Sequence, residues 1–209
     1  MPHFSRIVLA LILILPAIAP SSLAAGDEAE YLRKQERRLE REATNLFKVV
    51  LAEFGNAPGR CWFSTDWYSR EVPYHLARQY LGRRIRSDVT SPKVGVTTAE
   101  ILDPAGTHPE RFCNTEEFRE ALQGRMDESL ATNSSDSATN SVPQRDFSFP
   151  VFDRTFRTAI VLRSSSYYGW FMRDGQLQQS LGLVVDALVY RKANGQWRLV
   201  DDERLLSAE

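Results

Sequence analysis

The clearest strand and turn signals lie in "FSFPVFDRTFRTAIVLRSSSYYGWFMRDGQLQQSLGLVVDALVYRKANGQWRLVDDERL", residues 147–205. Asp174-Gly175 and Asn194-Gly195 favour tight hairpins, because these residue types tolerate positive φ. The segments between such turns are rich in β-branched and aromatic residues, and they predict strands at 149–152, 158–168, 181–191 and 196–201. On the last hairpin, the side chains expected to share one surface are Leu188, Tyr190, Trp197 and Leu199. We therefore expect residues 147–209 to form an antiparallel β-meander.

Residues 25–130 are predicted to be mostly helical. Apolar residues recur at three- and four-residue spacing over 26–54, and Phe118, Leu122, Met126 and Leu130 do so over 114–130. A shorter helix is expected over 73–86, with Pro73 in its first turn. The expected fold class is α+β, with these helices packed on one face of the C-terminal meander.

Two further segments complete the predicted organisation. Residues 1–24 have the features of a secretory signal peptide: Arg6, an apolar run at 7–19, then small residues before Ala25. Residues 131–146 are rich in Ser, Thr and Asn, which predicts a flexible linker or a long exposed loop. Residues 25–209 are expected to form one domain, located in the periplasm or secreted, with no stable membrane insertion after signal cleavage.

Export makes a disulfide the expected state of Cys61 and Cys113. The segment Cys61-Trp62-Phe63-Ser64 resembles the nucleophile segment of papain-type proteases. That family has a Gln shortly upstream and a His far downstream, whereas this chain has neither a Gln in 53–60 nor any His after His108. The sequence therefore predicts a structural crosslink and no nucleophile.

The charge balance and motifs narrow the functional classes. The formal net charge of −1 disfavours nucleic acid as a partner. The sequence contains no phosphate-binding glycine loop, serine-hydrolase elbow or metal-binding motif, and it predicts no catalytic residue, metal or cofactor. A carboxylate-dependent hydrolase is a weaker alternative, and its candidate acids are Glu71, Glu100, Asp103, Asp201 and Asp202.

Two binding hypotheses follow. In the first, the chain is a non-catalytic inhibitor or immunity-type protein that docks on another exported protein, such as a secreted enzyme or toxin. Its candidate contact residues combine aromatic rings with arginines, namely Trp67, Tyr68, Arg78, Arg83, Arg84 and Arg86. In the second, the concave face of the sheet binds a small ligand in a pocket lined by Phe152, Tyr168 and Trp170.

The hairpin "VYRKANGQWRLVDD", residues 189–202, resembles the closing strands of nuclear-transport-factor-like domains. It also resembles strands in many small exported bacterial proteins. The resemblance is confined to this one hairpin and assigns no family.

Overall fold

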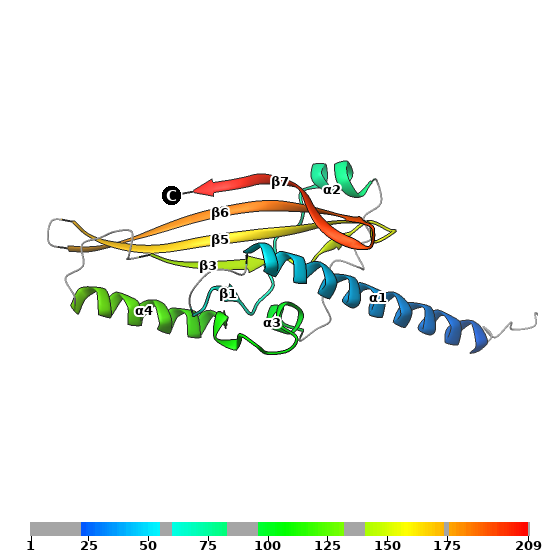
Figure 1. Cartoon of the computed structure of the whole chain (residues 1–209), viewed down its shortest axis with the longest axis horizontal. Coiled ribbons are helices and arrows are strands. Elements are labelled where there is room, and N and C mark those ends of the chain that lie inside the picture. Colours follow the sequence, from blue (N-terminus) through cyan, green and yellow to red (C-terminus); the bar gives the residue numbers. More distant parts are fainter. Residues whose placement is uncertain (1–21, 55–59, 83–95, 132–140, 174–175, 209) are drawn as a thin grey trace, which may run out of the picture. The chain divides into compact units, whose positions relative to one another are not determined.

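The structure is a computed structural model that describes residues 22–54, 60–82, 96–131, 141–173 and 176–208. Its elements are α1 (Ser22–Phe54), β1 (Phe63–Ser64), α2 (Tyr74–Leu81), α3 (Thr98–Leu102), the 3-10 turn η2 (Pro109–Arg111), β2 (Phe112–Cys113), α4 (Thr115–Ala131), β3 (Ser141–Phe147), β4 (Val151–Phe152), β5 (Thr158–Arg173), β6 (Gln176–Ala193) and β7 (Gln196–Ala208) (Figure 1). Residues up to Arg37 and residues from Arg38 form two compact units. The contacts described below all lie in the second unit.

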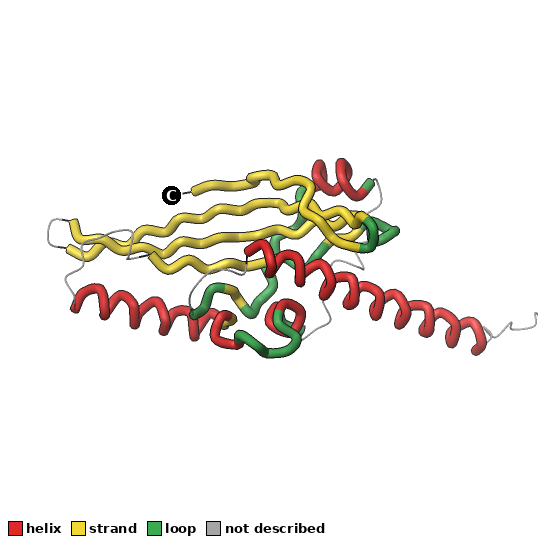
Figure 2. Tube along the Cα trace, viewed as in Figure 1, coloured by secondary structure: helices red, strands yellow, loops and turns green. Residues whose placement is uncertain are grey.

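The α+β class and the antiparallel meander are confirmed. The strand order is β2-β1-β3-β5-β6-β7, with β4 also paired to β5, and β5, β6 and β7 run antiparallel side by side (Figure 2). Asn194 and Gly195 both have positive φ, 52° and 80°, and they connect β6 to β7 as a two-residue turn. The other predicted turn, at 174–175, lies outside the described residues.

The predicted linker is wrong over residues 141–146. These residues belong to β3, which pairs antiparallel with β5 and parallel with β1. Their polar side chains conceal the strand in the sequence, but Val142 and Phe147 are 4% and 1% exposed and anchor its two ends in the core. Ala131 ends α4, and residues 132–140 lie outside the described residues. The predicted signal peptide also lies outside them, apart from residues 22–24 at the start of α1.

Cys61 and Cys113 form the predicted disulfide. Cys61 lies in the turn before β1 and Cys113 is the last residue of β2, so the bridge connects the segment ahead of one short strand with the end of its parallel neighbour rather than two helices. Their sequence separation of 52 residues makes the crosslink worth about 4 kcal/mol on the chain-entropy model. The bridge therefore holds β1 and β2 in register at the edge of the sheet.

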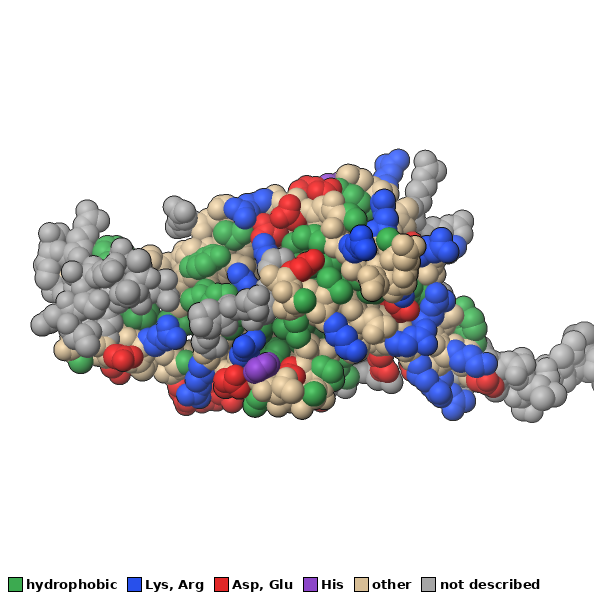
Figure 3. Space-filling view, in the orientation of Figure 1, with side chains coloured by type: hydrophobic (Ala, Val, Ile, Leu, Met, Phe, Trp, Pro, Cys, Tyr) green, Lys and Arg blue, Asp and Glu red, His purple; other side chains and the backbone are tan. Residues whose placement is uncertain are grey.

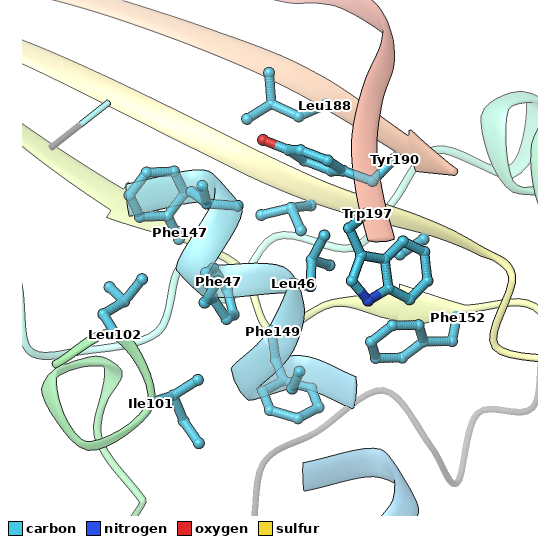
Figure 4. Close-up of a cluster of buried hydrophobic side chains, with 14 of the residues drawn as sticks. Leu46, Phe47, Ile101, Leu102, Phe147, Phe149, Phe152, Leu188, Tyr190 and Trp197 are labelled. Carbon is cyan, nitrogen blue, oxygen red and sulfur yellow. The ribbon is translucent and has the colours of Figure 1, made fainter. Parts of the chain in front are cut away.

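Helix α1, together with α3, packs on one face of the sheet, which we call the first face (Figure 4). The buried side chains of α1 recur at helical spacing: Leu39, Ala43, Leu46, Phe47 and Val50. The sheet contributes Ala159, Val161, Leu188, Tyr190 and Trp197 to the same cluster. Leu199 packs against it, so the predicted common surface of the last hairpin is confirmed.

The helices do not all lie on one face, which corrects the sequence-based expectation. On the opposite, second face, α2 packs Leu76 and Leu81 against β5 and β6. Further along the same face, Phe118 of α4 packs near Tyr168 and Trp170. The physical reason is the uninterrupted apolar runs at 159–162 in β5 and 187–190 in β6, which place apolar side chains on both faces.

Polar contacts fix where α1 lies on the first face. The Tyr190 hydroxyl donates to Glu53 Oε2 at 2.9 Å, and Lys192 Nζ lies 2.6 Å from Glu42 Oε2. Glu42 is 6% exposed, so this ion pair is almost fully desolvated on its acidic side. Because Glu53 is next to the last residue of α1, the helix ends above Tyr190 and leaves the far part of the first face beyond its C-terminus.

Candidate functional site

Cross-strand registers order the first face into rows that run from β5 through β6 to β7. The row that contains Val161 and Leu188 is buried beneath α1. Three rows follow away from the helix: Arg163–Asp186–Arg204, Ser165–Val184–Ser207 and Tyr167–Gly182. We call these three the open rows. They are continuous with the core beneath α1, because the register between β5 and β6 does not shift.

The first open row is a charged bridge across three strands. Arg163 Nη2 donates to Asp186 Oδ2 at 2.6 Å, and Arg204 Nε donates to Asp186 Oδ1 at 2.9 Å. Burial opposes ionisation of Asp186, but the hydrogen bonds and charges of the two arginines outweigh it and lower the pKa of that carboxyl. Both carboxylate oxygens are engaged, so Asp186 is suited to fixing the arginines rather than to transferring protons.

Arg145 of β3 adds a further guanidinium group beside the open rows. It is paired with Ser165, and its guanidinium carbon lies 4.7 Å from the centre of the Trp62 ring. Burial and the neighbouring Arg163 lower the pKa of Arg145, while Tyr167 opposes that shift. Two guanidinium groups thus bind one buried carboxylate, and a third, that of Arg145, lies near Arg163.

A hollow of about 420 Å³ lies over the open rows, away from α1. The residues that line it include Tyr167, Gly169, Phe171, Gly182, Val184 and Ser207. Tyr167 and Phe171 are 43% and 37% exposed, in contrast to the buried aromatic rings beneath α1. Gly169 and Gly182 contribute no side chain, which leaves room beside the Tyr167 ring. Figure 3 shows apolar side chains between charged ones over this part of the sheet.

The three predicted pocket residues are not brought together. Phe152 packs against Phe156 and Trp197 on the first face, in the core that α1 covers. Tyr168 packs against Phe118 of α4 on the second face, with ring centres 5.2 Å apart. Trp170 contributes to the wall of the hollow, but its side chain belongs to the buried cluster around the disulfide.

The predicted aromatic and arginine contact surface is also divided. Trp67 Nε1 donates to the Val96 carbonyl at 2.8 Å, and its ring packs against Phe47 and Phe149 in the core. Tyr68 is half-buried beneath α2. Arg78 is exposed on α2, while Arg83, Arg84 and Arg86 lie outside the described residues. Both aromatic residues of the predicted surface are therefore partly buried against core clusters.

The candidate acids have structural partners or are exposed. Glu100 completes a capping box with Thr97 at the start of α3, and Asp103 accepts backbone hydrogen bonds from Thr107 and His108. Asp201 accepts a hydrogen bond from Tyr80 of α2. Glu71 and Asp202 are exposed. Asp201 and Asp202 are neighbours on β7 and point to opposite faces of the sheet.

Sequence reasoning missed the residues that define the open rows. Arg163 and Asp186 lie 23 positions apart and meet only through the register of β5 and β6. A signal was present, since Asp186 interrupts an apolar strand segment and Arg163 directly follows one. A charge in the middle of a predicted buried strand calls for a partner on the neighbouring strand.

Comparison of the chain with protein-family models, curated proteins and solved structures found no match. Among the described residues, no cluster of His, Cys, Asp and Glu could hold a metal ion. Within the same ranges, no helix combines the length and apolarity needed to cross a membrane. The geometry of the open rows is therefore the basis for a functional proposal.

Proposed function

We propose that the protein is a non-catalytic binding protein that holds a small amphipathic ligand in the hollow over the open rows. The observation that carries the proposal is the hollow itself, where exposed aromatic rings and two glycines lie beside a fixed row of arginines. A volume of about 420 Å³ falls within the range of small-molecule sites.

The chemistry of the lining, together with that of the neighbouring row Arg163–Asp186–Arg204, specifies the ligand class. Tyr167, Phe171 and Val184 offer apolar contact to a ring or a short alkyl chain. Arg204 uses its Nε on Asp186, and its side chain is 60% exposed. Its Nη groups bond to no described residue and match a carboxylate, sulfonate or phosphate on the ligand. The ligand is accordingly an apolar body with one anionic group.

A matched pair of probes tests this function. 1-Anilinonaphthalene-8-sulfonate has an apolar body and an anionic group, while N-phenyl-1-naphthylamine has a similar body without the charge. We expect both to bind with one-to-one stoichiometry in a calorimetric titration. Arg204→Gln should weaken the sulfonate about tenfold, the loss expected for a hydrogen bond to a charged group. It should leave the neutral probe unchanged.

Two further variants place the probe in the hollow. Gly182→Leu fills the space beside Tyr167 and should abolish binding of both probes, while the circular dichroism spectrum stays native. Val200→Ser is the matched control, because Val200 is 50% exposed on β7 and does not line the hollow. Undiminished binding by the Gly182 variant would refute the proposal, and so would an equal loss in the Val200 variant.

Export is a separate part of the proposal. Its support is the signal-like sequence of residues 1–24 together with the Cys61–Cys113 disulfide. Amino-terminal sequencing of the protein from fractionated cells should find a chain that begins at Ala25, within one residue, in the periplasmic or secreted fraction. A full-length chain in the cytoplasmic fraction would contradict export and leave the binding proposal intact.

A further inference from the structure

Six exposed arginines gather at the end of the sheet opposite the hollow. They come from three segments: Arg38 and Arg41 of α1, Arg154 and Arg157 in the turn between β4 and β5, and Arg191 and Arg198 of the β6–β7 hairpin. We call this set the cationic end. Figure 3 shows Lys and Arg side chains concentrated where these hairpins end.

Hydrogen bonds hold the three segments together. Arg38 Nη2 donates to the Thr155 carbonyl at 3.2 Å, which joins α1 to the β4–β5 turn. The Lys192 backbone amide donates to the Arg157 carbonyl at 2.8 Å, which joins that turn to β6. The backbone segments that carry the arginines are thus joined in one framework.

The acids at this end are already engaged. Glu42 is buried against Lys192, and Asp153 accepts hydrogen bonds from Thr155 Oγ1 and from the backbone amides of Arg157 and Thr158. In contrast, Arg154, Arg157, Arg191 and Arg198 make no ion pair with any residue that the structure describes. The cationic end therefore has an excess of positive charge in a chain whose net charge is −1.

One pair within this set works against stability. Arg191 and Arg198 are direct cross-strand partners on β6 and β7. Like charges at such positions destabilise a sheet, since their Cβ atoms lie only about 5 Å apart. Two adjacent guanidinium groups also form a double fork for oxygen anions. An anionic group bound between them would relieve the repulsion.

We propose that the cationic end is a docking surface for a protein partner that presents clustered Asp and Glu side chains. Guanidinium forks match carboxylates in geometry, and the excess of positive charge is complementary to an acidic surface. An anionic membrane fits less well. Phe156 lies buried beneath Arg38 and Trp197 beside Lys192, so neither aromatic ring is available to insert into lipid. The chain's near-zero net charge also gives little general attraction to a charged bilayer.

The test measures fluorescence anisotropy of a labelled oligoglutamate peptide titrated with the purified protein. We expect saturable binding that weakens as salt increases. Replacing both members of the cross-strand pair, Arg191→Glu with Arg198→Glu, should weaken binding at least about tenfold. Arg119→Glu with Arg125→Glu on α4 is the matched control. It changes the net charge equally at exposed positions away from the cationic end, and it should have a much smaller effect.

A second readout separates loss of the surface from loss of the fold. Arg198→Glu alone should raise the melting temperature, because it replaces a like-charge pair with an opposite-charge pair. The same variant should bind the peptide more weakly than the unmodified protein. The proposal fails if the peptide does not bind, or if both double variants lose binding equally. It also fails if phosphatidylglycerol vesicles bind more tightly than the peptide, which would assign the surface to a membrane.

Discussion

The two halves of the first face use the same strands and the same side-chain parity, yet they have opposite characters. Beneath α1, β5 and β6 present Ala159, Val161, Leu188 and Tyr190, each with no measurable exposure. Beyond the end of α1, the same strands present Ser165, Tyr167, Gly182 and Val184. The pairing of β5 with β6 continues unchanged, whereas the pairing of β6 with β7 shifts between Val185 and Asp186. The difference therefore lies in the side chains, in that shift and in the helix above them.

The boundary between the halves is the row Arg163–Asp186–Arg204. This charged row separates an apolar core from rows that hold both the buried Ser165 and the exposed Tyr167, at 4% and 43% exposure. It stays stable because each buried charge has a partner on the neighbouring strand. Helix α1 is therefore the element that makes one half a core, whereas the other half is a preformed sheet surface.

The largest difference in stability is expected when one aromatic ring is removed from the covered half and one from the open rows. Phe47→Ala should lower the free energy of unfolding by about 3–5 kcal/mol, because the ring is fully buried between α1 and the first face. Tyr167→Ala should lower it by no more than about 1 kcal/mol, because that ring is 43% exposed. Urea unfolding followed by circular dichroism measures both. Similar losses for the two variants would mean that the open rows are part of the core.

The next largest loss of stability is expected from a substitution in the row Arg163–Asp186–Arg204. Asp186→Asn should cost about 3 kcal/mol at neutral pH, because it removes the charge that two arginines share in a buried position. The folded-state pKa of Asp186 lies below its ordinary value, so its contribution is present above that ordinary value and is lost as pH falls through the folded-state pKa. Denaturant midpoints measured from neutral to acidic pH should therefore converge for the variant and the unmodified protein.

Asp146→Asn is the matched control. Burial raises the pKa of Asp146 and Asp66 adds to the rise, while a hydrogen bond with Ser64 opposes it. The pH dependence is therefore opposite to that of Asp186. Folding favours the protonated form of Asp146, and this stabilising contribution is lost as pH rises through the raised pKa. At neutral pH the Asn variant should be at least as stable as the unmodified protein. A loss comparable to that of the Asp186 variant would show that burial alone, not the arginine pair, sets the cost.

The sequence predicted the covered half far better than the open half. Helical spacing identified the α1 face, and Asn194-Gly195 located the turn between β6 and β7, because both signals are local in the chain. The open rows depend on pairing between residues 23 or more positions apart, such as Arg163 with Asp186. Strand β3 was missed for a related reason, since only Val142 and Phe147 in a polar segment are anchored in the core. The pattern of apolar residues within one segment does not show which distant segment pairs with it.

A smaller effect is expected where α1 ends above the sheet. Tyr190→Phe should cost about 1 kcal/mol, the usual net value of one hydrogen bond, because Glu53 is exposed and water can replace the lost donor. Burial and the nearby Glu53 raise the pKa of the Tyr190 hydroxyl, so that group should not ionise while the protein is folded. Ultraviolet titration should find one fewer delayed tyrosine in the variant. A loss above about 3 kcal/mol would mean that this contact, and not apolar packing, holds the end of α1.

The smallest change in stability is expected from glycine substitutions, one in the open rows and one in a turn of the same sheet. A Cβ atom on Gly182 would lie 3.7 Å from Tyr167 Cβ, an ordinary contact, so Gly182→Ala should raise the free energy of unfolding by about 0.5 kcal/mol through a stiffer unfolded chain. Gly195 meets no neighbour but has φ of +80°, so Gly195→Ala should lower it by about 1 kcal/mol. Thermal unfolding of the two variants measures the contrast. If Gly182→Ala is destabilising instead, the hollow beside Tyr167 is narrower than its backbone geometry indicates, and the glycine serves the packing of the sheet rather than a ligand.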